Sequence, residues 1–167
     1  MVAVTYQSVS GTGRAAIEEL ERQVRAYVNG GEMSVKAYPH QIAFNVLPQI
    51  GSAKKEMPGF TTEEAKMTST CVRVPVFYAH SVAVHAEFGG PMTPESAREI
   101  LSRADGVKVI DDLAAAQYPM PLFTGGGDVV TVGRIRTDPS VENGLALFCC
   151  GDNIRKGAAQ NAVQIAE

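Results

Sequence analysis

The sequence predicts an α+β domain whose sheet is mixed but mainly antiparallel, with helices packed on one face. Apolar and polar residues alternate along 72–76 and 82–88, as expected of strands with one buried face. Apolar residues within 17–28 recur at helical spacing instead. No second strand–helix unit of the kind that builds a parallel sheet follows the first. With 167 residues, 45% of them hydrophobic and 20% charged, the chain fits one globular domain, 1–167.

The first elements are a strand, a turn and an amphipathic helix. Residues 2–6 form an apolar strand, and the Ser-Gly-Thr-Gly run at 10–13 is a turn. The apolar residues of the helix fall on one stripe: Ile17, Leu20, Val24, Tyr27 and Val28. The Asn-Gly-Gly run at 29–31 ends this helix, because glycine readily adopts the left-handed conformation that follows a helix.

The second half of the chain adds strands and two helices. A helix begins at Pro94, where Thr93 is the expected cap, and stops at 105–106. A last helix runs from about Asn153. Its apolar stripe comprises Ile154, Ala158, Ala162 and Ile165. Further strand-like runs lie at 107–110, 129–135 and 145–150.

Charge and cysteine usage exclude several classes of protein. A net charge of -3 and a pI near 5.6 provide no long-range attraction to nucleic acid or anionic membranes. No apolar run approaches the ~20 residues needed to span a bilayer, and no signal peptide is evident, which predicts a cytoplasmic protein. The three cysteines, with Cys149 and Cys150 adjacent, lack both a disulfide framework and metal-ligand spacing. No metal site is predicted.

A glycine motif near the N-terminus resembles a dinucleotide-binding fingerprint. Residues 11–16 fit G-x-G-x-x-A after a strand and at the start of a helix. However, the polar residues Gln7 and Ser8 separate the strand from the glycines. A tight turn at a helix N-terminus, with Ser10 capping free amides, explains the same pattern.

The stretch 71–81 places a guanidinium and an imidazole on either side of a proline. Arg73 offers a fork of donors that matches a carboxylate, and the ordinary pKa of His80 lies near neutrality. The alternative is that both are surface or packing residues near a strand end. A capping box at 61–64 would place Glu63 and Lys66 on one helix face, where an exposed ion pair is the simplest interpretation.

Five segments together resemble aspartate-semialdehyde dehydrogenases. They are TYQSVSGTG at 5–13, YPHQIAFNVLPQI at 38–50, FTTEEAKM at 60–67, CVRVPVFYAHS at 71–81 and the ending GDNIRKGAAQNAVQIAE. The resemblance extends over nearly the whole chain, but only to the second half of the enzyme. It implies a domain like the C-terminal domain of glyceraldehyde-3-phosphate dehydrogenase, without the N-terminal nucleotide-binding domain.

The resemblance also implies a reaction. The family reduces β-aspartyl phosphate to aspartate semialdehyde with NADPH through a cysteine thioester, in the biosynthesis of lysine, threonine and methionine. Gln7 would orient the reacting group, and His80 would be the acid–base residue. Arg73 would bind the substrate carboxylate, Lys66 the phosphate and Glu63 the substrate ammonium.

NADP would be bound mainly by the absent half, with Ser10, Gly11 and Asn153 of this chain as additional contacts. The resemblance further implies a homodimer, without nucleic-acid or membrane partners. None of Cys71, Cys149 and Cys150 has a setting like that of the family's nucleophile, so the isolated chain is expected to be inactive.

Two other interpretations remain open at this stage. One is a homologous dimerisation or assembly module that has lost the chemistry, and the other is an acyl-phosphate reductase for a different amino-acid derivative. Catalysis makes a geometric demand that an assembly module does not. In one regular strand, Arg73 and His80 would be roughly 23 Å apart on opposite faces. The chain must therefore bend between Pro75 and Ser81, so that both side chains converge on one cleft beside Gln7 and the Ser10-Gly11 turn.

Overall fold

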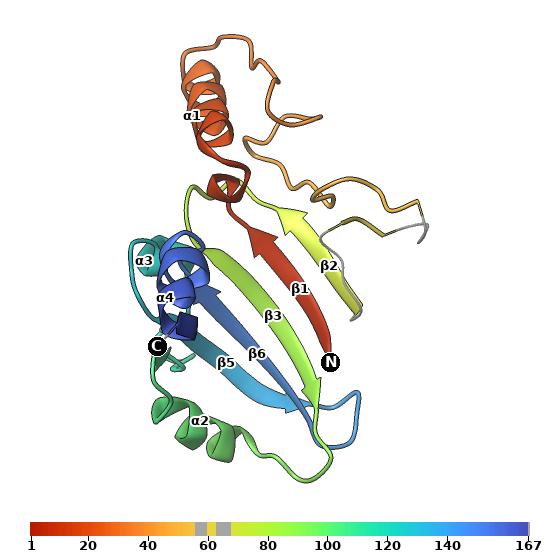
Figure 1. Ribbon diagram of the computed structural model, residues 1–167, viewed down its shortest axis with the longest axis vertical. Helices are drawn as coiled ribbons and strands as arrows, with labels where there is room; N and C mark the ends of the chain where they lie inside the picture. Colours follow the sequence, from red (N-terminus) through yellow and green to blue (C-terminus); the bar gives the residue numbers. More distant parts are fainter. Residues whose placement is uncertain (56–59, 63–67, 167) are drawn as a thin grey trace.

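A computed structural model describes residues 1–55, 60–62 and 68–166, and in these the strands form one six-stranded sheet (Figure 1). The strand order is β2-β1-β3-β6-β5-β4. The strands are β1 (Val2–Gln7), β2 (Thr68–Arg73), β3 (His80–Glu87), β4 (Val107–Val109), β5 (Val130–Asp138) and β6 (Gly144–Gly151). The pairs β1–β3, β3–β6 and β5–β6 are antiparallel, and the pairs β1–β2 and β4–β5 are parallel. The predicted mixed α+β fold is confirmed.

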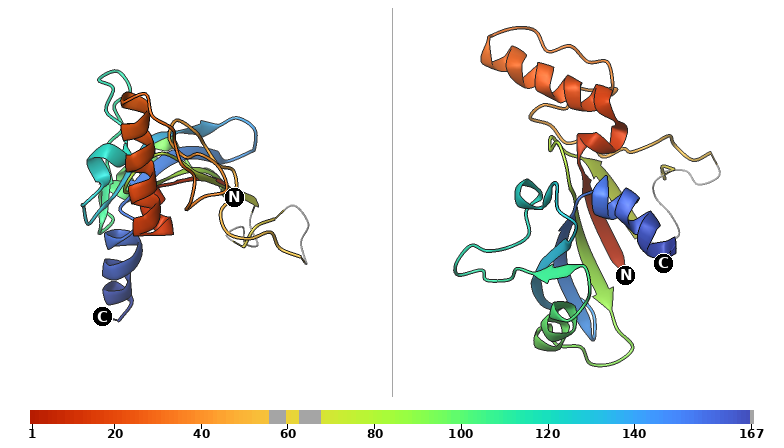
Figure 2. Two further views of the ribbon diagram at one scale, coloured as in Figure 1. Left: turned by 90° about the horizontal axis from the view of Figure 1, so that it is seen from above. Right: turned by 60° about the vertical axis from the view of Figure 1, so that its left-hand side comes forward.

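The helices are α1 (Arg14–Val28), α2 (Pro94–Ser102), α3 (Pro121–Thr124) and α4 (Gln160–Ala166). A 3-10 turn, Val9–Thr12, joins β1 to α1, and a π-helical turn, Arg155–Ala159, precedes α4. Figure 1 shows α1 beyond one end of the sheet and α2 near the other end. The C-terminal α4 projects away from the sheet (Figure 2), and its side chains are largely exposed.

The two faces of the sheet have different coverings. The predicted start of α2 is confirmed, since Thr93 accepts a hydrogen bond from the Ser96 amide. Its buried Ala97 packs with Val132 on β5. The one-turn α3 lies over the opposite face, because Thr124 hydrogen bonds to Thr131, the neighbour of Val132. The helix α2 therefore covers one face, and α3 contacts the other.

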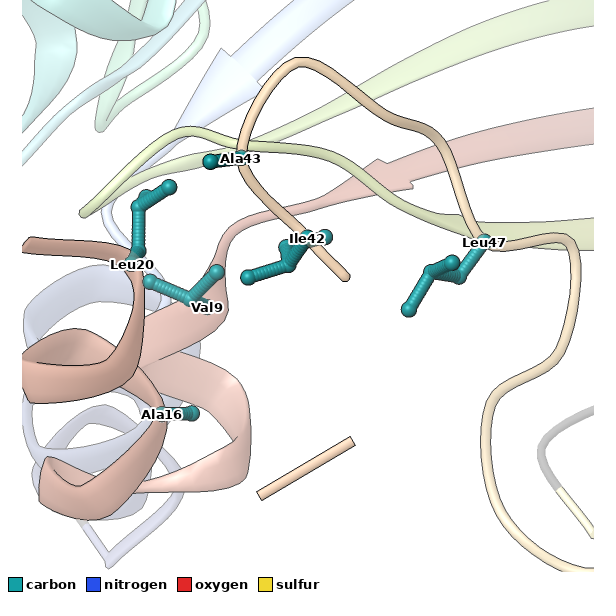
Figure 3. Close-up of a cluster of buried hydrophobic side chains, with 6 residues drawn as sticks. All are labelled: Val9, Ala16, Leu20, Ile42, Ala43 and Leu47. Atoms are coloured by element: carbon teal, nitrogen blue, oxygen red, sulfur yellow. The ribbon is translucent and has the colours of Figure 1, made fainter. Parts of the chain in front are cut away.

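A second core joins α1 to the segment 34–47 (Figure 3). It contains Val9, Ala16, Leu20, Ile42, Ala43 and Leu47. Two fully buried polar side chains of α1, Glu19 and Gln23, hold the same segment. Glu19 accepts hydrogen bonds from the amides of Lys36 and Ala37, and Gln23 accepts from the amides of 42 and 43. These contacts satisfy backbone donors of a segment with little regular structure of its own.

Three expectations about individual elements were wrong. The strand expected at 72–76 ends at Arg73, because Pro75 has no amide hydrogen to continue the pairing. Tyr27 and Val28 are exposed, since the buried stripe of α1 is formed by 16, 19, 20 and 23. The last helix begins as a π-helical turn, and Ile154 and Ile165 on its stripe are exposed.

Candidate functional site

Arg73 and His80 lie on the same face of the sheet. Arg73 pairs with Gln7, and two residues earlier on β1, Thr5 pairs with Val82 of β3. Because side chains alternate along a strand, Gln7, Arg73 and His80 all point to the face of Val82. The bend that the sequence predicted between Pro75 and Ser81 is present: β2 ends at Arg73 and β3 starts at His80.

The side chains of Arg73 and His80 meet at Gly11. A Cβ added to Gly11 would lie 2.8 Å from Arg73 Nη1 and 3.3 Å from His80 Nε2. The Val9–Thr12 turn is held at this point because the amides of Val9 and Ser10 donate to the carbonyls of Val76 and 77. Glycine is therefore required by space, since any side chain at 11 would collide with the Arg73 guanidinium and approach the His80 ring.

His80 is surrounded by small polar side chains. Its Nδ1 accepts a hydrogen bond from the Ser8 amide at 3.1 Å and lies 3.0 Å from Ser8 Oγ. Asn153 Oδ1 accepts from Ser8 Oγ and Ser10 Oγ, each at 3.2 Å, and from the Ala79 amide at 3.1 Å. This Ser8–Ser10–His80–Asn153 network joins the ends of β1, β3 and β6.

The expected cap of α1 is corrected by this network. Ser10 does not cap the helix: the cap position is Gly13, which makes no side-chain cap hydrogen bond. The hydroxyl of Ser10 bonds to Ser8 and Asn153 instead. Gly13 suits its position because its φ of 103° favours glycine.

The ionisation of His80 is strongly perturbed. Burial and the nearby Arg73 guanidinium lower the pKa of His80 from 6.5 to about 4, against the backbone of Ala79 and the Asp152 carboxylate, which raise it. At neutral pH the ring is therefore uncharged. A neutral imidazole can donate one hydrogen bond and accept another without placing a second positive charge beside the guanidinium.

Arg73 is anchored through both its backbone and its side chain. Its amide donates to the Leu47 carbonyl at 2.8 Å and its carbonyl accepts from the Leu47 amide at 2.9 Å. Its Nη1 donates to the Ser8 carbonyl, and the residue is 5% exposed. The segment held by Glu19 and Gln23 thus positions Arg73, whose guanidinium is the kind of group that binds a carboxylate or phosphate oxygen.

The remaining predicted site residues divide into two groups. Gln7 is partly buried at the end of β1 and donates from Nε2 to Thr5 Oγ1 at 3.3 Å, on the face of Arg73. Glu63 and Lys66 lie outside the described residues, so the structure does not place the predicted phosphate and ammonium ligands.

A cavity of about 780 Å³ opens beside this site. Its wall is mainly apolar and includes Phe77, Tyr78, Leu122 and Ile154, together with Asp152. Arg73 and His80 do not line it, so the side chains converge as expected, but this cavity is not the shared cleft that the sequence led us to expect.

Ser8 and Asp152 are site residues that the sequence analysis did not identify. The Asp152 carboxylate accepts from the amides of Gly126, Ile154 and Arg155, which fixes the chain on both sides of the cavity. Burial raises the pKa of Asp152, but these three hydrogen bonds outweigh it and lower the pKa. The available signal was position alone, since Ser8 and Asp152 lie within family-like motifs, next to the predicted site residues Gln7 and Asn153.

Neither a metal-ligand cluster nor a membrane-spanning helix is found in the described part of the chain. Within 1–55, 60–62 and 68–166, no group of three or more His, Cys, Asp and Glu side chains could hold a metal ion. In the same residues, no helix is both long and apolar enough to cross a membrane.

The chain was compared with known proteins. The family model for the semialdehyde dehydrogenase dimerisation domain matches residues 1–156. Aspartate-semialdehyde dehydrogenase from Aquifex aeolicus is 48% identical over 100% of this chain and 53% of its own length. The corresponding protein from Legionella pneumophila is 50% identical over 98% and 51%. The chain thus spans about half the length of these relatives.

Solved structures give the same result for the fold. Aspartate semialdehyde dehydrogenase II from Vibrio cholerae, crystallised in complex with ASA, superimposes with a TM-score of 0.92 at 41% identity, covering 99% of this chain and 52% of that chain. Aspartate semialdehyde dehydrogenase from Candida albicans, solved with NADP, is 18% identical and covers 91% of this chain and 45% of that chain. Its TM-score of 0.57 shows a similar fold only.

Proposed function

The chain belongs to the semialdehyde dehydrogenase family as its dimerisation domain, and on this basis we propose that it is the substrate-binding half of an NADP-dependent aspartate-semialdehyde dehydrogenase. The complete enzyme would reduce β-aspartyl phosphate to aspartate semialdehyde through a cysteine thioester. The observation that carries the proposal is the convergence of Arg73 and His80 on Gly11. An assembly module has no need of this arrangement.

Each residue at the site has a chemical task in this proposal. Arg73 binds the substrate α-carboxylate through its guanidinium group, whose position is fixed by the Ser8 carbonyl. His80 serves the acid–base steps at the thioester carbonyl, and Gln7 orients that group. Lys66 and Glu63 bind the phosphate and the ammonium, as the family motif implies.

The proposed cofactor contacts are three residues close to His80. Ser10, Gly11 and Asn153 lie together at the end of the sheet, where they would meet the nicotinamide of NADP held mainly by the other half. An acyl-phosphate reductase for another amino-acid derivative would keep His80 and change the groups around the carboxylate. The buried guanidinium of Arg73 favours a substrate that carries a carboxylate.

The nucleophilic cysteine would come from the other half. Burial raises the pKa of Cys150 to about 11 and also raises the pKa of Cys149. Cys71 is buried on β2. A thiol that stays protonated near neutral pH is a poor nucleophile, so the environments of Cys149 and Cys150 support the proposal.

We predict that the 167-residue chain has no dehydrogenase activity alone and becomes active when fused to the nucleotide-binding half of the Aquifex aeolicus relative. Activity would be followed as phosphate-dependent reduction of NADP by aspartate semialdehyde. The matched control is the same fusion carrying His80→Gln, which should lose activity by at least about 100-fold. Turnover by the chain alone, or a His80→Gln fusion as active as the unmodified fusion, would contradict the proposal.

We also propose a homodimer formed through the sheet face opposite Arg73. The side chains of Val2, Val4 and Tyr6 alternate onto this face, and the Tyr6 ring lies 6.3 Å from the Phe148 ring. Val2 is 44% and Tyr6 37% exposed, which leaves apolar surface open on this face of β1.

Light scattering at micromolar concentration should give twice the mass of the chain. Tyr6→Arg should produce a monomer, because it would place an unpaired charge in the interface on both subunits. The control is Tyr27→Arg, an equally drastic change at a residue that is 62% exposed on α1. A monomeric unmodified chain, or a dimer that survives Tyr6→Arg, would refute this interface.

A further inference from the structure

The hydrogen bonds around His80 determine where its ring proton resides. A backbone amide can only donate, and the Ser8 amide points at Nδ1 from 3.1 Å. Nδ1 must therefore present its lone pair. A neutral imidazole carries one proton, so that proton is on Nε2.

The surrounding hydroxyls are consistent with this assignment. Ser8 Oγ also lies 3.0 Å from Nδ1 and can donate to it or to Asn153 Oδ1, which accepts from Ser10 Oγ as well. A proton on Nδ1 would face the Ser8 N–H directly, with two donors opposed at hydrogen-bond distance. Burial makes such a mismatch costly.

The Nε2 side of the ring lies beside Gly11. A Cβ there would be 3.3 Å from His80 Nε2 and 2.8 Å from Arg73 Nη1, so glycine is what lets the imidazole and the guanidinium both approach this turn. With its proton on Nε2 the ring is a donor next to the guanidinium, and neighbouring donors suit an oxygen atom that carries, or develops, negative charge.

We propose that His80 acts as a neutral imidazole whose proton is fixed on Nε2 by the Ser8 backbone amide, and that it donates a hydrogen bond from Nε2 to the reacting substrate oxygen. Its role as donor rests on the proposed function, whereas the tautomer does not. In this state Nε2 acts first as a donor, and it can accept a proton only after its own proton has passed to the substrate oxygen. Ser8 is then a positioning residue that acts through His80.

The charged groups around the ring come from different elements. The Arg73 guanidinium on β2 opposes a positive charge on His80, while the Asp152 carboxylate after β6 and the Ala79 backbone before β3 favour one. Burial of the ring has the largest effect and also opposes a charge, so the pKa of His80 is lowered to about 4. The hydrogen-bond geometry then selects between the two neutral tautomers.

Another histidine in the same chain provides an internal contrast. His85 Nδ1 lies 2.7 Å from Asp138 Oδ2. Hydrogen bonds from Ser140 and His85 lower the pKa of Asp138 to about 2, so this carboxylate only accepts. His85 must therefore donate from Nδ1, the opposite arrangement to His80.

The test is two-bond ¹H–¹⁵N correlation NMR of the ¹⁵N-histidine-labelled chain at pH 7, with His80 assigned from the signals missing in His80→Gln. We expect His80 to show the Nε2–H pattern and His85 to show a protonated Nδ1. An Nδ1–H or doubly protonated His80 at pH 7 would overturn the inference. This readout needs no activity, so it stands or fails separately from the proposed function.

Two variants identify the group that fixes the tautomer. Ser8→Ala removes the hydroxyl but keeps the amide, so His80 should retain the Nε2–H pattern. Ser8→Pro removes the amide hydrogen as well, and the φ of -69° at Ser8 suits proline. In that variant we expect the ring to populate both tautomers while His85 is unchanged.

Either variant can refute the role of the amide. An Nδ1–H signal in Ser8→Ala would show that the hydroxyl, not the amide, sets the tautomer. An unaltered Nε2–H pattern in a folded Ser8→Pro would show that Ser8 does not set it. If Ser8→Pro fails to fold, the unmodified chain and Ser8→Ala still decide the question.

Discussion

Gly133→Ala is expected to destabilise the domain by at least about 3 kcal/mol. A Cβ at Gly133 on β5 would lie 1.9 Å from the Ile110 carbonyl oxygen and 2.8 Å from Pro119 Cδ. The Ile110 amide is itself tied to the Val132 carbonyl at 2.8 Å, so the overlapping backbone cannot move away without losing that bond. The segment after β4 would have to leave the sheet.

The measurement is urea unfolding followed by circular dichroism. The matched control is Gly89→Ala, where an added Cβ would meet nothing within 4 Å, so its effect should stay within about 1 kcal/mol. An unfolding free energy for Gly133→Ala within 1 kcal/mol of the unmodified chain would show that the contact with Ile110 is not tight. Both variants change one hydrogen into one methyl group, so the difference isolates the close approach.

Arg73→Lys is expected to lower kcat/KM for aspartate semialdehyde by about 100- to 1,000-fold in the fusion with a nucleotide-binding half. Lysine keeps the positive charge but loses the planar fork that can hold a carboxylate at two points while also bonding the Ser8 carbonyl. Arg73 is buried, so water would not readily replace the lost donors. The fall should appear in KM as well as in kcat, because the carboxylate is bound in both ground and transition states.

The control for this variant is Arg25→Lys. Arg25 forms an exposed ion pair with Glu21 on α1, with its side chain 73% exposed, so the exchange should leave kcat/KM within about twofold. Thermal unfolding of both variants separates a binding defect from a folding defect. An Arg73→Lys enzyme with unchanged kcat/KM would remove Arg73 from the substrate site.

The sequence predicted the parts of the fold that follow from alternation and from proline. Pro75 marked the place where pairing stops, and this break is why Arg73 and His80 reach one face despite their odd spacing. The cap at Thr93 was predicted from local sequence as well, because a threonine directly before a proline is typical of a helix N-terminus.

The parts that could not be predicted depend on contacts between distant residues. Because Glu19 and Gln23 are polar, a pattern of apolar residues predicts that both are exposed on α1. Both are buried, because their side-chain oxygens accept hydrogen bonds from backbone amides of the segment 34–43. The parallel pairing of β1 with β2 likewise joins strands separated by about sixty residues. Ser8 gave no signal of its own, because its effect on His80 comes through a backbone amide that every sequence contains.

The Ser8–Ser10–His80–Asn153 network is built from this chain alone. The rotational freedom of these side chains is therefore lost when the domain folds and not when a substrate or a second domain arrives. Ordering a flexible side chain at the moment of binding costs about 0.5–1.5 kcal/mol, which such preorganisation avoids. This domain therefore holds a network whose side chains are already ordered before any partner binds. In the enzyme we propose, the nucleotide-binding half could diverge in cofactor preference while this network stays unchanged.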